Sequence, residues 1–156
     1  MSTPIGNLKD ITYRAVEILK KVPLIAAEDT RHSKILLSHF DISTPLISYF
    51  EHNKFSRIPK LIDHLKSGND LALITDAGTP GISDPAYRLV RKAISCFILI
   101  ESVPGPSAFL AGLVSSGLPT DRFIFEGFLP PKKGRKKRLI SVENEEATLI
   151  YYESPN

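Results

Sequence analysis

The stretch from Leu71 to Pro85, LALITDAGTPGISDP, constrains the fold more than any other part of the chain. It begins as an apolar run of strand length and breaks into a turn with two glycines and a proline. Asp84 and Pro85 then predict a helix start, with Asp84 as the N-cap and Pro85 at the first helical position. Such a corner is typical of parallel α/β sheets, whose ligands bind at the carboxyl ends of the strands. A plain connector needs one glycine at most, so we interpret the turn as a binding loop.

Strands and helices alternate through the first two thirds of the chain, which predicts βαβ units and a parallel open sheet. Expected helices include one capped by Asp10 and one over 56–67. Further apolar strands are expected at 24–27, 46–50, 97–100, 123–128 and 147–152. The strand at 97–100 is apolar throughout, which predicts burial on both faces. We place a domain boundary where this rhythm changes, so that residues 1–119 form an N-terminal α/β domain and 120–156 begin an incomplete second α/β domain.

Positive charge is concentrated in one segment. The 156 residues hold 20 Lys and Arg against 17 Asp and Glu. Six of the basic residues lie close together: Lys132, Lys133, Arg135, Lys136, Lys137 and Arg138. Such a cluster is often a solvated loop, but it also favours contact with a polyanion such as RNA.

The cysteine, histidine and hydropathy patterns limit where the protein works and which cofactors it uses. Cys96 is the only cysteine, which excludes an internal disulfide and suits a reducing cytoplasm. No signal peptide or membrane-spanning run is recognised in these residues. The four histidines and the cysteine lack the spacing of metal ligands. We therefore expect a cytoplasmic protein that uses neither a membrane nor a metal.

Five stretches in order resemble the bacterial small-subunit (16S) ribosomal RNA cytidine 2′-O-ribose methyltransferases, a branch of the tetrapyrrole methylase superfamily. They are Thr3–Leu8, Ala27–Arg31, Asp76–Pro85, Pro104–Ala108 and Gly117–Phe123. The resemblance implies a first α/β domain with a parallel open sheet covered by helices on both faces, then a second α/β domain. It implies S-adenosylmethionine as methyl donor and a cytidine ribose as acceptor, in small-subunit ribosomal RNA or the assembled subunit. It also implies a homodimer, with the donor in the cleft between domains.

The resemblance further implies which residues line the donor pocket. From the first part of the chain these are Pro4, Asp76, Ala77, Gly78, Thr79, Pro80, Gly81, Ile82, Ser83, Val103, Pro104, Ser107 and Ala108. From the second domain they are Tyr151 and Tyr152. Asp76 would serve a plain loop as a turn-capping carboxylate, but the specificity of the surrounding motif favours ligand contact.

Candidate catalytic residues follow another expected strand. Glu28, Asp29 and Arg31 would orient the ribose or help to take its proton, because a base must lie within hydrogen-bond reach of the alcohol. An equally good interpretation is a solvated cluster at a helix start, with an acid–arginine pair of little energetic weight. Tyr49 and Phe50 are expected to pack in the core rather than to stack on a base. His52 is expected to be a surface or half-buried histidine rather than a base.

Two other functions remain open. Members of the family usually begin with an apolar strand before Thr3 and continue well beyond Asn156, so this chain resembles a truncated member. It would then be a non-catalytic RNA-binding remnant, and by itself only marginally stable or dependent on dimerisation. In that case we expect weak donor binding and no useful methyl transfer. A methylase of a tetrapyrrole-type small molecule shares the fold, but the form of the Asp76 motif and the basic segment favour RNA.

Overall fold

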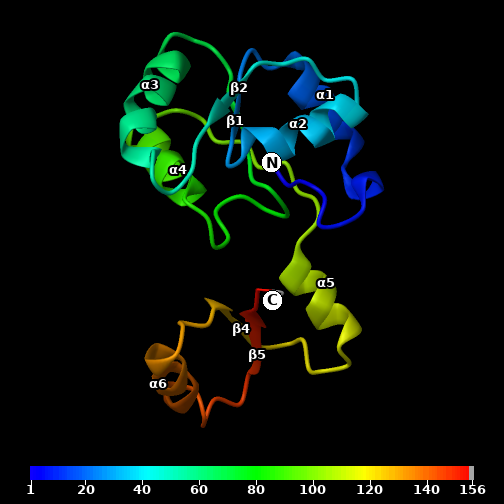
Figure 1. Ribbon diagram of the computed structural model, residues 1–156, viewed down its shortest axis with the longest axis vertical. Helices are drawn as coiled ribbons and strands as arrows, with labels where there is room; N and C mark the ends of the chain where they lie inside the picture. Colours follow the sequence, from blue (N-terminus) through cyan, green and yellow to red (C-terminus); the bar gives the residue numbers. More distant parts are fainter. Residues whose placement is uncertain (155–156) are drawn as a thin grey trace. The chain divides into compact units, whose positions relative to one another are not determined.

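The computed structural model describes residues 1–154, apart from the side chain of Lys133. It consists of two compact units, Met1–Ser107 and a second unit that begins at Ala108. The first unit contains a parallel sheet of β1 (Ile25–Ala27), β2 (Leu46–Ser48) and β3 (Ala72–Ile74), in the order β2-β1-β3. Figure 1 labels β1 and β2 of this sheet. The expectation of a parallel α/β sheet is thereby confirmed.

Helices cover both faces of this sheet, as expected. They are α1 (Tyr13–Lys21), α2 (Thr30–His39), α3 (Lys54–Lys66) and α4 (Ala86–Ser95). Successive residues of a strand point to opposite faces. Ile25 and Ala27 accordingly belong to the core that contains residues of α1 and α2, whereas Ala26 packs with Leu61 of α3 and Leu89 of α4.

Several helices start at other residues than expected. Thr12 caps α1, because its Oγ1 accepts a hydrogen bond from the Ala15 N–H at 3.1 Å. Asp10, the expected cap, ends a separate 3₁₀ turn over Leu8–Asp10. Helix α3 begins at Lys54 and α4 at Ala86, one residue after Pro85. The carboxylate of Asp84 still accepts from the Ala86 N–H at 2.7 Å, so its capping role is retained.

The strand expected at 97–100 is not formed. Phe97 adopts a left-handed backbone with φ of 58° and is fully exposed, and Leu99 is 90% exposed. Apolar composition favours a strand, but a strand also needs a neighbour for its backbone N–H and C=O groups. Within the described residues the sheet ends at β3, and no strand pairs with this segment.

The second unit contains α5 (Ala108–Ser115), β4 (Phe123–Phe128), α6 (Lys133–Ser141) and β5 (Thr148–Tyr152). Strands β4 and β5 pair in parallel. The structure divides before α5, whereas the sequence placed the boundary after it, between residues 119 and 120. The reason is aromatic packing, because Phe109 of α5 stacks on Phe125 of β4 with ring centroids 4.9 Å apart. In the described part of the chain, every helix is too short or too polar to cross a membrane.

Candidate functional site

Three loops meet at the carboxyl edge of the first unit's sheet. The strands are parallel and in register, with Ala27 of β1 opposite Ser48 of β2 and Ile74 of β3. The residues that follow each strand are therefore brought together. These are the Glu28–Arg31 segment, the Tyr49–His52 segment and the loop over 75–85.

The expected donor loop is tied to the start of the chain. Thr3 and Gly78 form an antiparallel bridge, with N–H···O distances of 2.9 and 3.1 Å. The Thr3 hydroxyl donates to the Thr75 carbonyl at 3.0 Å, and this bond is buried. These contacts place the neighbouring Pro4, another expected donor residue, beside the loop.

The segment over 103–106 lies against the same loop. The Thr79 hydroxyl donates to the Pro106 carbonyl at 3.2 Å, and the Ser2 N–H donates to the Val103 carbonyl at 3.2 Å. A Cβ added to Gly105 would approach Ser2 Cβ to 2.9 Å, so only glycine fits there without a shift. The structure thus brings together the expected donor-binding segments of the first unit. Whether they hold a donor stays a prediction.

The backbone of the loop is open to a ligand. Gly78 and Gly81 have φ of +79° and +90°, which favours glycine. A Cβ built on Gly81 meets no atom within 4 Å, so the space beside this α-carbon is free. Asp84 fixes the turn, because its Oδ2 accepts from the Gly81 N–H at 2.8 Å. Burial raises the pKa of Asp84. The sequence indicated this residue only as a cap and missed its hold on the loop.

Two cross-strand contacts join the donor loop to the candidate catalytic segment. The Asp76 carboxylate accepts from the Asp29 N–H at 3.0 Å. The Thr75 hydroxyl donates to Glu28 Oε2 at 2.7 Å. Asp76 therefore links the ends of β3 and β1, a role that the sequence did not indicate. Its contact with a ligand remains a prediction.

Asp29 and Arg31 form a local pair at the start of α2. Asp29 Oδ1 accepts from the Arg31 N–H at 2.8 Å and thereby caps the helix. The guanidinium Nη2 lies 2.7 Å from Asp29 Oδ2. These hydrogen bonds hold the pKa of Asp29 well below its usual range. A carboxylate so readily ionised is a poor general base at neutral pH, so this geometry favours a capping and orienting role for the pair.

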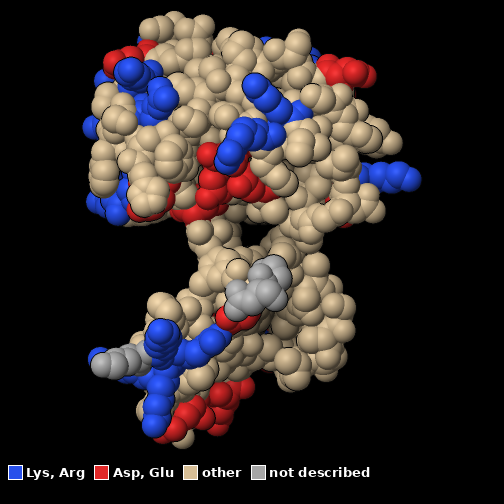
Figure 2. All heavy atoms as spheres, viewed as in Figure 1, with Lys and Arg blue, Asp and Glu red and all other residues tan. Residues whose placement is uncertain are grey.

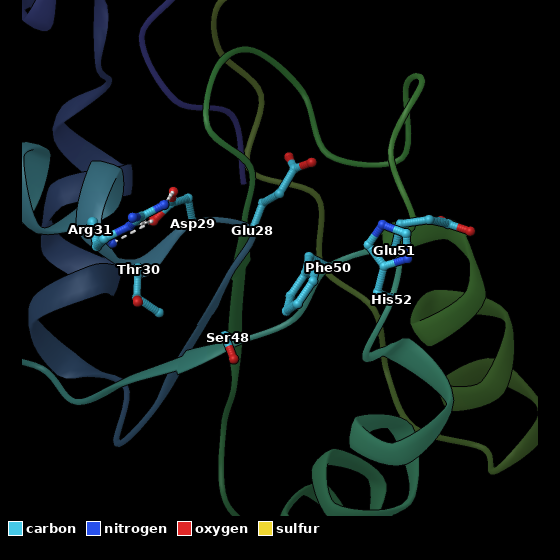
Figure 3. Close-up of a pocket in the computed structure, with 8 residues that line it drawn as sticks. All are labelled: Glu28, Asp29, Thr30, Arg31, Ser48, Phe50, Glu51 and His52. Carbon is cyan, nitrogen blue, oxygen red and sulfur yellow. Dashed lines mark hydrogen bonds and ion pairs between the residues drawn. The ribbon is translucent and has the colours of Figure 1, made fainter.

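A hollow of about 480 Å³ opens beside these residues (Figure 3). It is lined by Glu28, Asp29, Thr30, Arg31, Ser48, Phe50, Glu51 and His52. Figure 3 shows Phe50 between the Asp29–Arg31 pair on one side and Glu51 with His52 on the other. The loops after β1 and β2 together form its wall.

The two aromatic residues after β2 have different surroundings. Tyr49 is buried, and its hydroxyl donates to the Pro85 carbonyl at 3.0 Å, so the expectation of core packing is confirmed. For Phe50 this expectation is wrong, because the ring is 36% exposed and lines the hollow. Period-two alternation along β2 would have placed Tyr49 and Phe50 on opposite sides of the chain. His52 is exposed, as expected.

The remaining candidates lie in the second unit. Tyr151 and Tyr152 are the last residues of β5, and the ring of Tyr152 packs edge-on against Phe125 at 4.8 Å. Most of the basic segment forms helix α6 rather than a loop. Arg135 pairs with Glu153, and Arg138 pairs with Glu126. Lys132, Lys136 and Lys137 are exposed. The side chain of Lys133 lies outside the described part of the structure. The donor and RNA contacts expected of these residues stay predictions.

The structure is an α/β protein with a glycine-rich loop and a hollow at the carboxyl edge of a parallel sheet. The family model of tetrapyrrole (corrin/porphyrin) methylases matches residues 2–156, and the chain belongs to this family. It is 54% identical to Ribosomal RNA small subunit methyltransferase I of Pseudomonas aeruginosa and 52% identical to the protein of the same name from Synechocystis sp.. Each alignment covers 100% of this chain and 56% of the relative.

A third relative, from Escherichia coli O157:H7, has the same name and is 51% identical over 97% of this chain and 54% of its own length. The resemblance to ribosomal RNA methyltransferases that the sequence suggested is therefore confirmed. The chain spans about half the length of the curated relatives it matches.

Proposed function

We propose that this chain supplies the donor-binding and acceptor-binding edge of an S-adenosylmethionine-dependent methyltransferase. The acceptor is the 2′-hydroxyl of a cytidine ribose in small-subunit ribosomal RNA. The similarity to relatives named Ribosomal RNA small subunit methyltransferase I carries this proposal. The site described above supports it, because the segments expected to bind the donor are hydrogen-bonded to one another beside a hollow.

The first unit's residues fit the donor. When bound, S-adenosylmethionine supplies a methyl group on a positively charged sulfur. The loop over 76–83 and the segment over 103–107 would hold it, since the open side of Gly81 leaves the backbone accessible. The carboxylates of Asp76 and Asp84 belong to the same edge, and negative charge favours a cation. Figure 2 shows acidic side chains gathered on the first unit.

The hollow beside the loop fits the acceptor nucleotide. Methyl transfer from a sulfonium is an in-line displacement, so positioning contributes most of what the protein must provide. Thr75 holds Oε2 of Glu28, which leaves Oε1 to accept the proton of the ribose hydroxyl. Asp29 stays ionised and fixes Arg31, whose guanidinium would orient the ribose or its phosphate.

The proposal also includes RNA binding by α6 and a homodimer. The exposed lysines of α6 would contact phosphates, a sequence-independent contribution to affinity. The homodimer implied by the resemblance belongs to the same proposal, and sedimentation of the full-length protein tests it. The alternative function is RNA binding without methyl transfer.

Methyl transfer separates these alternatives. A full-length version would be given labelled S-adenosylmethionine with small-subunit ribosomal RNA, with assembled small subunits, or with a tetrapyrrole precursor. We expect label in RNA, in one of the two ribosomal forms, and none in the tetrapyrrole. Glu28→Gln should lower kcat with little change in donor affinity, whereas the matched control Glu17→Gln, exposed on α1, should behave as wild type. Label in the tetrapyrrole alone would contradict the proposal.

A further inference from the structure

Two exposed aromatic rings and an arginine form a cluster on α3 and α4. Phe55 is 70% exposed and Tyr87 is 49% exposed, although both are large enough to favour burial. The guanidinium carbon of Arg88 lies 5.5 Å from the centroid of Phe55 and 5.8 Å from that of Tyr87. Both distances lie within the range of cation–π attraction. We call Phe55, Tyr87 and Arg88 the aromatic–arginine surface.

Lys54, a buried residue, packs against the aromatic–arginine surface. Lys54 is buried, forms an ion pair with Glu51, and places its Nζ 5.3 Å from the centroid of Phe55. Burial and the charge of Arg88 lower the pKa of Lys54. The Phe55 ring thus lies within cation–π distance of two basic side chains, Lys54 and Arg88. Such packing holds the rings in place before any partner arrives, which reduces the entropy lost on binding.

The surface lies beside the hollow. Phe55 is at the second position of α3, which follows directly on the loop of Glu51 and His52. Tyr87 is at the second position of α4, which follows the donor loop. The two helices pack against each other on one face of the sheet (Figure 1). Both begin at the sheet edge where the expected donor and acceptor meet.

We propose that the aromatic–arginine surface binds single-stranded RNA, so that bases next to the target nucleotide stack on Phe55 and Tyr87. This inference rests on the proposed function, because the acceptor must be RNA. Proteins recognise unpaired RNA bases by stacking them on aromatic rings and guanidinium planes. Arg91 and Lys92, exposed on the following turn of α4, add positive charge for the phosphates.

Charge favours RNA over a second copy of this chain. In a symmetric dimer the same patch meets itself, and here that would place the arginines and lysines of α4 near their own copies. Like charges brought together at an interface oppose association. A polyanion meets the same patch with opposite charge.

The test measures binding of a fluorescein-labelled single-stranded RNA oligonucleotide containing cytidine to the full-length protein. The variants are Phe55→Ala, Tyr87→Ala, their double variant and Arg88→Gln. The matched control is Tyr13→Ala, on α1, where the ring is 92% exposed. We expect each aromatic variant to weaken RNA binding about 5- to 150-fold, the range for loss of one base–aromatic stack. Tyr13→Ala should leave Kd unchanged, and no variant should change the affinity for S-adenosylmethionine.

Salt dependence separates stacking from charge. Arg88→Gln should reduce the slope of log Kd against log salt concentration by about 0.7, the value for one phosphate contact with a single strand. The aromatic variants should keep the wild-type slope. Phe55→Leu and Tyr87→Leu retain apolar packing without a ring, and they should weaken binding as the alanine variants do. Circular dichroism would verify that each variant remains folded.

The outcomes distinguish this inference from the proposed function. If the wild type methylates RNA but the double variant binds RNA as tightly as wild type, the inference is wrong and the proposed function stands. If the wild type neither binds RNA nor transfers a methyl group, both fail. Sedimentation that shows a dimer in the wild type and a monomer in the double variant would assign the surface to a second copy and overturn the inference.

Discussion

Replacing Gly78 by valine tests how the donor loop works. Gly78 has φ of +79°, a conformation that costs an L-residue roughly 1–2 kcal/mol. A Cβ there would lie 3.5 Å from Ile5 Cγ2 and 3.9 Å from the Pro106 carbonyl oxygen, which are ordinary contacts. The first added carbon therefore fits, and the cost is mainly backbone strain. A typical stability of ~5–15 kcal/mol survives such a loss, so Gly78→Val should remain folded.

The two outer methyl groups of valine then decide the effect on the donor. Gly78 is bridged to Thr3, and an added Cβ would face the Pro106 carbonyl, so branched carbons there would fill space beside the expected donor-binding backbone. We expect S-adenosylmethionine to bind the full-length variant at least tenfold more weakly, which corresponds to about 1.4 kcal/mol. Isothermal titration calorimetry measures this affinity directly.

Gly68→Val is the matched control for strain. Gly68 has φ of +82°, follows the end of α3, and has no atom within 4 Å of an added Cβ. Both variants should lose a similar ~2–8 °C in Tm, from ~2–4 °C per kcal/mol in a protein of 150–250 residues. Only Gly78→Val should lose donor affinity. Unchanged affinity in Gly78→Val, or an equal loss in both variants, would refute the reasoning.

Three further predictions concern the basic segment, the Asp29–Arg31 pair and the activity of residues 1–156. Neutralising Lys132, Lys133, Arg135, Lys136, Lys137 and Arg138 should flatten the salt dependence of RNA binding, by about 0.7–0.9 per lost phosphate contact, and an unchanged slope would exclude contact between α6 and RNA. Arg31→Gln should raise the pKa of Asp29 toward its ordinary ~3.9, and NMR titration of the carboxyl group would measure this change. Because the pKa of Asp29 is depressed in the folded protein, the Asp29–Arg31 pair stabilises the fold above the ordinary pKa, and this stabilisation is lost as pH falls through the depressed pKa. Residues 1–156 alone should bind a dye for exposed apolar surface through Phe97 and Leu99. They should bind the donor weakly and transfer no methyl group at a useful rate, and robust turnover by residues 1–156 would contradict this.

The sheet and its loop could be predicted from sequence because local signals agreed. The apolar run, the glycine turn and the helix cap each predict part of one strand–turn–helix connection, and the three predictions are consistent. The sequence wrongly predicts a strand at 97–100, because pairing with a neighbouring strand is a tertiary property that apolar composition does not encode. The same limit applies to α5, whose place in the second unit depends on the stacking of Phe109 on Phe125.

The candidate site was partly visible for a similar reason. The glycines and carboxylates of the loop stand in one continuous motif, and their resemblance to a family is local in sequence. The hollow combines the ends of β1 and β2, so the exposure of Phe50 depends on the register of two strands. The hold of Asp84 on Gly81 and of Asp76 on Asp29 depends on loop conformation, which no spacing in the sequence indicates.

Nucleoside mass spectrometry of the reaction product tests the central claim most directly. Full-length protein would be incubated with labelled S-adenosylmethionine and small-subunit ribosomal RNA or assembled subunits, and the RNA then digested to nucleosides. The account predicts labelled 2′-O-methylcytidine, greatly reduced with Gly78→Val and retained with Gly68→Val. Label on a base, on another nucleoside's ribose, or on no RNA at all would contradict it.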